Sequence, residues 1–371
     1  MTQPAGAIPV SRPPVWGDEA DALREAIENR WLSGTSEAVD LFEAEFAARH
    51  GSPYAIAVSS GTTALHLALV ALGVGSGDEV IVPDFTMISP VLAVMYVGAE
   101  PVAVDADDTW NLDVAAVKER ITERTRAIVA VHTYGLPADV VALAEIARSH
   151  GVALVEDAAE ALGACVDGRL AGTFGDVACF SFYANKLLTT GEGGMLLTPH
   201  ESVAAAARDK RNLCFGAERR FEHSDVGFNY RLSGLQAALG RAQLRHLDET
   251  VAAKRAVAAA YDERLRPIRG CTLPPRAAGR EHVFWVYGIL VGDGAARDDL
   301  AAALAQRRIE TRPFFTPLHA QPVLRDLLMP AAAFPRATAL GERGLYLPSF
   351  VGMRSEEIDR VCDAVTAALR C

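Results

Sequence analysis

Short apolar runs alternate with longer amphipathic segments through the first two thirds of the chain. The apolar runs have the composition of buried strands, and the segments between them carry apolar residues at helical spacing. This alternation predicts an α/β fold, with right-handed crossovers and a mainly parallel sheet covered by helices on both faces. The predicted strands are residues 54–58, 80–83, 101–107, 127–135, 152–157, 180–182 and 195–198, and the predicted helices include 17–30, 39–49, 114–121, 140–149 and 201–212.

A second structural unit is expected in the last third of the chain. The sequence has 371 residues and is 50% hydrophobic, enough to bury one large core and a smaller one. A long helix is predicted at 247–265, with Lys254 and Asp262 on its outer surface, and another at 355–369. We therefore expect a large α/β domain with an N-terminal arm at 1–245, and a connecting helix with a smaller C-terminal α+β domain at 246–371.

Composition excludes several classes of function. The net charge is −11 and no basic stripe is present, which argues against nucleic-acid binding. The six cysteines show no zinc-ligand spacing, so no metal site is expected, and they are typical of reduced thiols in a cytoplasmic protein. The first residues do not resemble a signal peptide, and no apolar run is long enough to span a membrane.

Four candidate functional residues lie at or just after the ends of predicted strands: Gly61, Met87, Asp157 and Lys186. Ligands of α/β sheets gather at the carboxyl ends of strands, so these residues are expected in one crevice. A lysine can form a Schiff base with pyridoxal phosphate, and an acid can keep the pyridine nitrogen of that cofactor protonated. Taken alone, Lys186 is equally compatible with a surface lysine and Asp157 with a helix cap.

The segment that follows the first predicted strand has the composition of an anion site. Small residues at 59–61 let the backbone approach an anion, and Thr62 opens a helix whose N-terminal amides favour phosphate. A helix cap without any ligand is the alternative.

Four segments together resemble the DegT/DnrJ/EryC1/StrS family of sugar aminotransferases, in the order that the family has them. They are VSSGTTALHLAL, EDAAEALGA, FSFYANKLLTTGEGGM and GFNYRLSGLQAALG, and the likeness extends over nearly the whole chain. The resemblance implies fold type I, which is the aspartate aminotransferase-like fold, and pyridoxal phosphate as cofactor. Within the family, FWVYGILV and ETRPFFTPLH look most like the GDP-perosamine synthase branch.

The resemblance implies three catalytic residues. Lys186 would bind the cofactor and later move a proton, Asp157 would hold the ring nitrogen, and Glu160 would contact the side of the ring that carries the hydroxyl group. The family usually stacks an aromatic residue on the cofactor ring, where this chain has Met87. Phe85 is the alternative residue for that stacking.

The resemblance also implies a homodimer with shared active sites. Gly61, Thr62 and Ser181 would surround the cofactor phosphate, and Asn229 of one chain would complete the phosphate site of the other. The polar segment 216–223 is expected to be a loop bordering the neighbouring active site.

Arg312 and His319 are candidate substrate contacts, and a structural role is equally compatible with each. The likeness implies a nucleotide-linked keto-6-deoxy sugar as acceptor, with GDP-4-keto-6-deoxymannose giving GDP-perosamine, and glutamate as amino donor. Amination at C3 in the manner of mycosamine, and amination of a cyclitol or another nucleotide sugar, are alternatives. Two more distant alternatives are a dehydratase of the same fold, in which histidine replaces the lysine, and a non-catalytic regulator.

Overall fold

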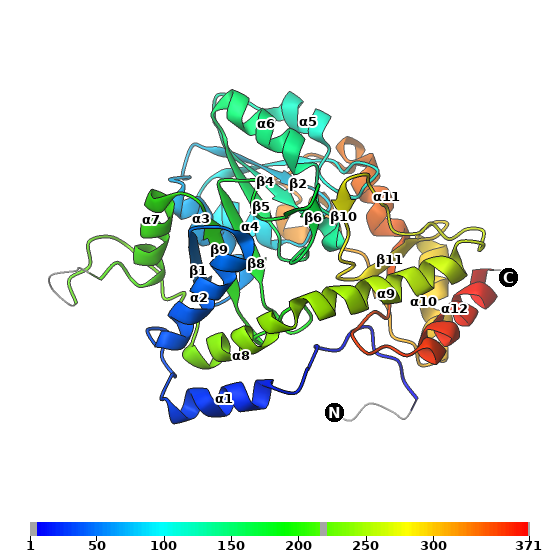
Figure 1. Cartoon of the computed structure of the whole chain (residues 1–371). Helices are drawn as coiled ribbons and strands as arrows, with labels where there is room; N and C mark the ends of the chain where they lie inside the picture. Colours follow the sequence, from blue (N-terminus) through cyan, green and yellow to red (C-terminus); the bar gives the residue numbers. More distant parts are fainter. Residues whose placement is uncertain (1–5, 216–220, 370–371) are drawn as a thin grey trace.

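The computed structural model describes residues 6–215 and 221–369 (Figure 1). The predicted loop at 216–223 therefore lies mostly outside the described residues. Within the described part of the chain, no helix is long and apolar enough to cross a membrane.

The centre of the larger unit is a seven-stranded sheet in the order β1-β9-β8-β5-β4-β2-β3. All neighbouring strands pair in parallel except β9, which is antiparallel to both β1 and β8. This confirms the predicted α/β fold with its mainly parallel sheet. The strands are β1 (Tyr54–Val58), β2 (Glu79–Pro83), β3 (Glu100–Val104), β4 (Thr125–Val131), β5 (Ala153–Asp157), β8 (Val177–Ser181) and β9 (Gly194–Thr198).

Helices cover both faces of this sheet because alternate strand residues feed two separate cores. In β2, Val80 and Val82 pack in the core that contains α3, whereas Ile81 packs in the core beneath α5 and α6. Figure 1 shows α5 and α6 together on one side of the sheet. The helices of this unit are α1 (Glu19–Glu28), α2 (Glu37–His50), α3 (Gly61–Ala71), α4 (Ser89–Tyr96), α5 (Val114–Arg120), α6 (Val140–His150), α7 (Glu201–Arg211) and α8 (Gly234–Arg245).

The long helix α9 (Leu247–Leu265) leads from the large sheet to a smaller unit (Figure 1). This unit holds an antiparallel sheet in the order β11-β13-β12 and has its own apolar core. Its elements are β11 (Tyr287–Leu290), α10 (Gly294–Gln306), β12 (Arg312–Pro313), α11 (Pro335–Arg343), β13 (Gly344–Leu347) and α12 (Ser355–Leu369). The remaining short elements are η1 (Thr133–Gly135), β6 (Cys165–Val166), β7 (Arg169–Leu170), β10 (Arg280–Glu281), η2 (Leu318–Ala320), η3 (Pro322–Leu324) and η4 (Ala331–Ala333).

The N-terminal arm crosses to the smaller unit. Ile8 forms a parallel bridge with Ile309 and is buried in the core of that unit. The main chain of Val10 accepts a hydrogen bond from the N–H of Ser349 at 3.0 Å. The arm therefore joins the first residues of the chain to its last quarter.

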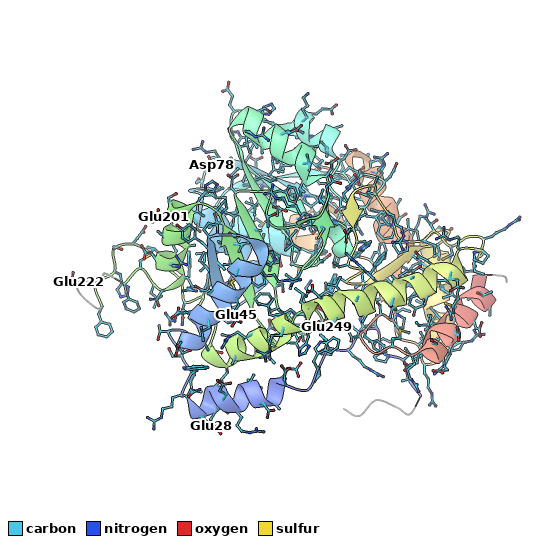
Figure 2. All side chains as sticks on the ribbon, viewed as in Figure 1. Glu28, Glu45, Asp78, Glu201, Glu222 and Glu249 are labelled. Atoms are coloured by element: carbon cyan, nitrogen blue, oxygen red, sulfur yellow. The ribbon has the colours of Figure 1, made fainter. Side chains whose placement is uncertain are left out.

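The prediction that Lys254 and Asp262 lie on the outer surface of α9 is wrong. Lys254 is only 4% exposed, and its ammonium donates hydrogen bonds of 2.6 Å to the main-chain oxygen and the hydroxyl of Ser349. Asp262 is also buried and accepts a hydrogen bond from the Tyr287 hydroxyl at 2.7 Å. The helix contributes apolar residues to the cores of both units, and these two polar residues find their partners in the smaller one. Acidic side chains such as Glu28, Glu201 and Glu249 instead lie on the outside (Figure 2).

Candidate active site

Asp157, Glu160 and Lys186 meet at the carboxyl edge of the large sheet. Asp157 is the last residue of β5, and Lys186 lies in the segment that connects β8 to β9. The Nζ atom of Lys186 is 3.9 Å from Oε1 of Glu160. Both acids are buried, and the lysine side chain is only 12% exposed. The chain thus brings one amine and two carboxyl groups into a single buried cluster.

Burial dominates the electrostatics of this cluster. It raises the pKa of Glu160 to about 7, although the opposing charge of Lys186 lowers it. It also raises the pKa of Asp157, again against the field of Lys186. Burial lowers the pKa of Lys186, while the charges of Glu160 and Asp157 act in the opposite direction. An amine with a lowered pKa next to a carboxyl group that titrates near neutrality is suited to proton transfer.

The N-terminus of α3 closes one side of the same edge. Ser60 caps this helix by accepting a hydrogen bond from the N–H of Thr63. Gly61 lies directly against Ser181, because a Cβ atom at residue 61 would be only 2.8 Å from Cβ of Ser181. The hydroxyl of Thr62 is 2.8 Å from that of Ser89. The N-terminal amides of α3 and the side chains of Thr62 and Ser181 therefore surround a place suited to a phosphate.

Met87, not Phe85, is available to cover a ligand. Phe85 is fully buried, and its ring packs against Tyr134 and two phenylalanines of the smaller unit. Met87 is 47% exposed, and its sulfur accepts hydrogen bonds from the N–H and hydroxyl of Ser89. Because Ser89 also contacts Thr62, the Met87 loop is tied to the N-terminus of α3.

Asn229 is exposed at the same edge. Its main chain bridges Asn212, and the carbonyl of Tyr230 accepts a hydrogen bond from the N–H of Ser59 at 2.9 Å. The Asn229 side chain is thus presented beside the loop that precedes α3.

The two candidate substrate contacts lie in different surroundings. Arg312 is exposed and lines a cavity of about 360 Å³ together with Tyr183, Asn185, Trp285 and other residues. Its guanidinium also pairs with Glu310 at 2.5 Å. His319 is more deeply buried: Nδ1 is 2.6 Å from Oδ2 of Asp84, and its ring stacks on a phenylalanine. The contacts of His319 are those of a residue that fixes the loop after β2 against the smaller unit.

The sequence analysis missed two residues of this site. Tyr134 has left-handed backbone angles, φ 55° and ψ 10°, and its N–H donates a 2.7 Å hydrogen bond to Oε2 of Glu160. Trp285 lies beneath Lys186, with Nζ 3.6 Å from the centre of the indole ring. The sequence offered one signal for Tyr134, its place in HTYG at the end of the strand predicted at 127–135. Trp285 stands in FWVYGILV, which supports the likeness to one branch of the family but gives no sign of a contact with Lys186.

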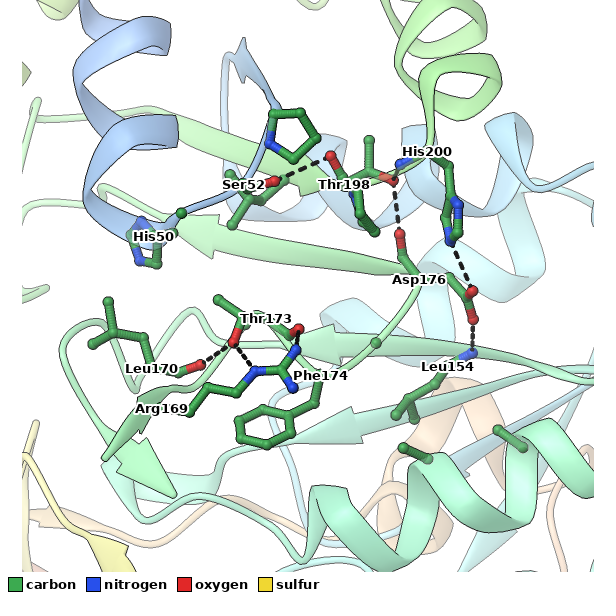
Figure 3. A pocket seen from close by; sticks show the side chains of 18 of the residues that line it. His50, Ser52, Leu154, Arg169, Leu170, Thr173, Phe174, Asp176, Thr198 and His200 are labelled. Atoms are coloured by element: carbon green, nitrogen blue, oxygen red, sulfur yellow. Dashed lines mark hydrogen bonds and ion pairs between the residues drawn. The ribbon is translucent and has the colours of Figure 1, made fainter. Parts of the chain in front are cut away.

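A larger cavity of about 1080 Å³ lies at the opposite edge of the sheet (Figure 3). Several of its polar groups bind one another. Asp176 accepts a hydrogen bond from the N–H of Leu154 and pairs with His200, and Arg169 donates to the Thr173 hydroxyl and stacks on Phe174. Nε2 of the buried His50 has no hydrogen-bond partner in the part of the chain that the structure describes. No lysine is among the described residues that line this cavity, so we place the active site at the carboxyl edge.

Comparison with known proteins identifies the family of the chain. A model of the DegT/DnrJ/EryC1/StrS aminotransferase family matches residues 16–366. The chain belongs to this family. Members of the DegT/DnrJ/EryC1/StrS aminotransferase family depend on pyridoxal phosphate, so this chain is a pyridoxal phosphate-dependent aminotransferase.

Relatives within the family match the chain along its whole length. GDP-perosamine synthase of Caulobacter vibrioides is 43% identical, with 98% of each chain covered. GDP-perosamine synthase of Escherichia coli O157:H7 is 37% identical, covering 96% of this chain and 97% of the relative. Among solved structures, DesV of S. venezuelae superimposes with a TM-score of 0.92 at 36% identity, covering 98% of this chain and 99% of DesV.

The residues present fit the cofactor of the family. The close approach of Gly61 to Ser181 leaves a helix N-terminus free of side-chain bulk, which suits the phosphate group. A buried amine at Lys186 suits the cofactor carbonyl, and the buried acid Asp157 suits the ring nitrogen.

Proposed function

We propose that this aminotransferase converts GDP-4-keto-6-deoxymannose to GDP-perosamine, with glutamate as the amino donor. The observation that carries the proposal is the cluster of Lys186, Glu160 and Asp157 in a chain that is 43% identical to a GDP-perosamine synthase. Amination at C4 of a GDP-linked sugar follows from that relative and from a second one at 37% identity. Presence of Lys186 disfavours the dehydratase, in which histidine stands at this position.

Each residue of the cluster has a task in this reaction. Pyridoxal phosphate, when bound, supplies a carbonyl for the amine and an electron sink for the carbon that loses its proton. Lys186 would hold the cofactor through that carbonyl, and its Nζ would move a proton between two carbon atoms. Asp157 keeps a proton on the ring nitrogen by its negative charge. Glu160 lies 3.9 Å from Nζ and holds the lysine in place.

The proposal places the remaining residues around the two substrates. Gly61, Thr62 and Ser181 bind the cofactor phosphate, and Met87 covers the ring. Arg312 binds an anionic group of a substrate in its 360 Å³ cavity. Asn229 completes the phosphate site of a second subunit, so the working enzyme is a homodimer, and it acts in the cytoplasm.

The test follows the amino group through both half-reactions. The purified protein, loaded with pyridoxal phosphate, should lose its visible cofactor band when glutamate is added. Adding GDP-4-keto-6-deoxymannose should then restore the band and give GDP-perosamine by mass spectrometry. Lys186→Ala should remain folded and transfer no amine.

A dTDP-linked 4-keto-6-deoxy sugar is the matched control substrate. If it restores the band faster than the GDP sugar does, the proposed nucleotide is wrong. A product aminated at C3 would make the proposed position wrong. A protein that never acquires the visible band would contradict the assigned lysine site.

A further inference from the structure

Trp285 contacts the catalytic lysine in two ways. The centre of its indole ring is 3.6 Å from Nζ of Lys186. Its ring N–H donates a 2.8 Å hydrogen bond to the carbonyl of Asn185, the residue that directly precedes the lysine. Trp285 itself is only 8% exposed. One side chain from the last third of the sequence therefore contacts both the amine and the backbone of the lysine segment.

A glycine makes this approach possible. Gly135 has a φ of +101°, and a Cβ atom there would lie 3.1 Å from the N atom of Trp285 and 3.0 Å from the carbonyl oxygen of Glu160. The N–H of Val283 donates a hydrogen bond to the carbonyl of Gly135 at 3.0 Å. The absence of a side chain at Gly135 thus allows the main chains of Trp285 and Glu160 to pack closely on either side of residue 135.

The charged groups around Lys186 come from three parts of the chain. Asp157 ends β5 and Glu160 follows it, and their charges favour a protonated lysine. Lys254 of α9 and Arg12 of the arm line the same small cavity as Lys186 and Trp285. The negative face of an indole ring attracts an ammonium group by roughly 0.5–2 kcal/mol. The ring therefore adds an attraction for the protonated amine in a place where burial opposes the charge.

We propose that Trp285 is a positioning residue for Lys186. Its ring face holds the protonated amine while the lysine is not bound to the cofactor, and its N–H fixes the backbone that presents the lysine. The inference rests on the proposed function for its role in turnover, because the lysine must leave the cofactor and return to it. The contact itself belongs to the polypeptide and is testable without cofactor or substrate.

Two substitutions separate the two contacts. Trp285→Phe keeps an aromatic face and loses the hydrogen bond to Asn185. Trp285→Met fills space with a flexible side chain but loses both the face and the hydrogen bond. The experiment labels cofactor-free protein with a limiting amount of an amine reagent across a range of pH. Peptide mass spectrometry then gives the labelling rate of Lys186, with exposed Lys118 as the internal reference.

The midpoint of the labelling curve reports the pKa of Lys186, and its plateau at high pH reports access of the reagent. We expect Trp285→Met to lower the midpoint, so that Lys186 labels about two- to thirtyfold faster at neutral pH relative to the plateau. Trp285→Phe should move the midpoint less than methionine does. In holoenzyme, Trp285→Met should reduce kcat more than it raises KM for the sugar.

An unchanged midpoint in Trp285→Met would overturn the proposal, and so would an equal shift in the phenylalanine and methionine variants. If Trp285→Met does not fold, Trp285→Leu takes its place with the same expected result. The labelling curve requires no substrate. A wrong sugar would therefore leave this result intact, whereas a failed midpoint shift would leave the transamination test intact.

Discussion

At the scale of single residues, Glu160 carries the clearest dependence on pH. Its Oε2 accepts a hydrogen bond from the N–H of Tyr134, and its Oε1 lies 3.9 Å from Nζ of Lys186. Burial raises its pKa to about 7 from an ordinary value of 4.5. Between these two values the folded protein binds a proton more tightly than the unfolded chain does. Stability from this group is therefore present at low pH and is lost as the pH rises toward 7.

Glu160→Gln tests this assignment. Glutamine still accepts the hydrogen bond from Tyr134 but does not ionise. We expect the profile of kcat/KM against pH to lose its ionisation near 7, because that profile reports groups of the free enzyme. The unfolding free energy should also lose its decline between pH 4.5 and 7. Glu145→Gln on exposed α6 is the control and should change neither curve, so equal behaviour of the two variants would contradict the role of Glu160.

Some site residues could be predicted from the sequence and others not. Asp157 and Lys186 stand in motifs at the ends of strands, so topology alone brings them to one edge. Tyr134 acts through its backbone N–H, and the left-handed conformation that aims this group has no signature in a tyrosine. Trp285 reaches the lysine across the fold, through a close approach at Gly135 that only three-dimensional structure reveals.

At the scale of elements, the ends of a strand or helix could be predicted where a single hydrophobic pattern covers the whole segment. The bounds predicted for 54–58, 247–265 and 355–369 match β1, α9 and α12. The surface of α9 was not predictable, because a helix between two cores has no single apolar face. Lys254 illustrates this: among the described residues its ammonium is bound by Ser349 and paired with no acid, and burial lowers its pKa to about 7.

Lys254→Met should change how stability depends on pH. The pKa of Lys254 in the folded protein is below its ordinary value of 10.5, so the unfolded chain binds the proton more tightly. Wild-type stability from this group is greatest above 10.5 and declines as the pH falls toward 7. Relative to the variant, the wild type should gain about 1.4 kcal/mol per pH unit over this window.

Urea unfolding of both proteins at several pH values between 7 and 10 measures this difference. Lys118→Met, at an exposed position on α5, is the control, and its unfolding free energy should depend on pH in the same way as that of the wild type. A Lys254→Met curve parallel to the wild type would mean that the buried amine keeps its ordinary pKa.

At the scale of the whole molecule, the proposed sharing of Asn229 between subunits predicts complementation. Asn229→Ala should bind cofactor weakly, and Lys186→Ala should be inactive. In a mixed dimer, one site combines Lys186 of one chain with Asn229 of the other. Random pairing of the two variants should therefore restore roughly a quarter of the wild-type sites.

The measurement is the rate of amine transfer after co-expression of the two variants, compared with each variant alone. Activity no greater than the sum of the separate variants would show that Asn229 serves its own chain. A mixture of Asn229→Ala with wild-type protein controls for loss by dilution.

The contacts of the N-terminal arm affect the order in which this protein can fold during its synthesis. Ile8 is bridged to Ile309, and Val10 is bonded to Ser349. During synthesis the arm leaves the ribosome about 300 residues before Ile309, its bridging partner. All strands of the large sheet have been made once synthesis passes Thr198, so the sheet can assemble before the partners of the arm exist. The arm is thus made before the large sheet but can dock only after Ile309 and Ser349 have been made.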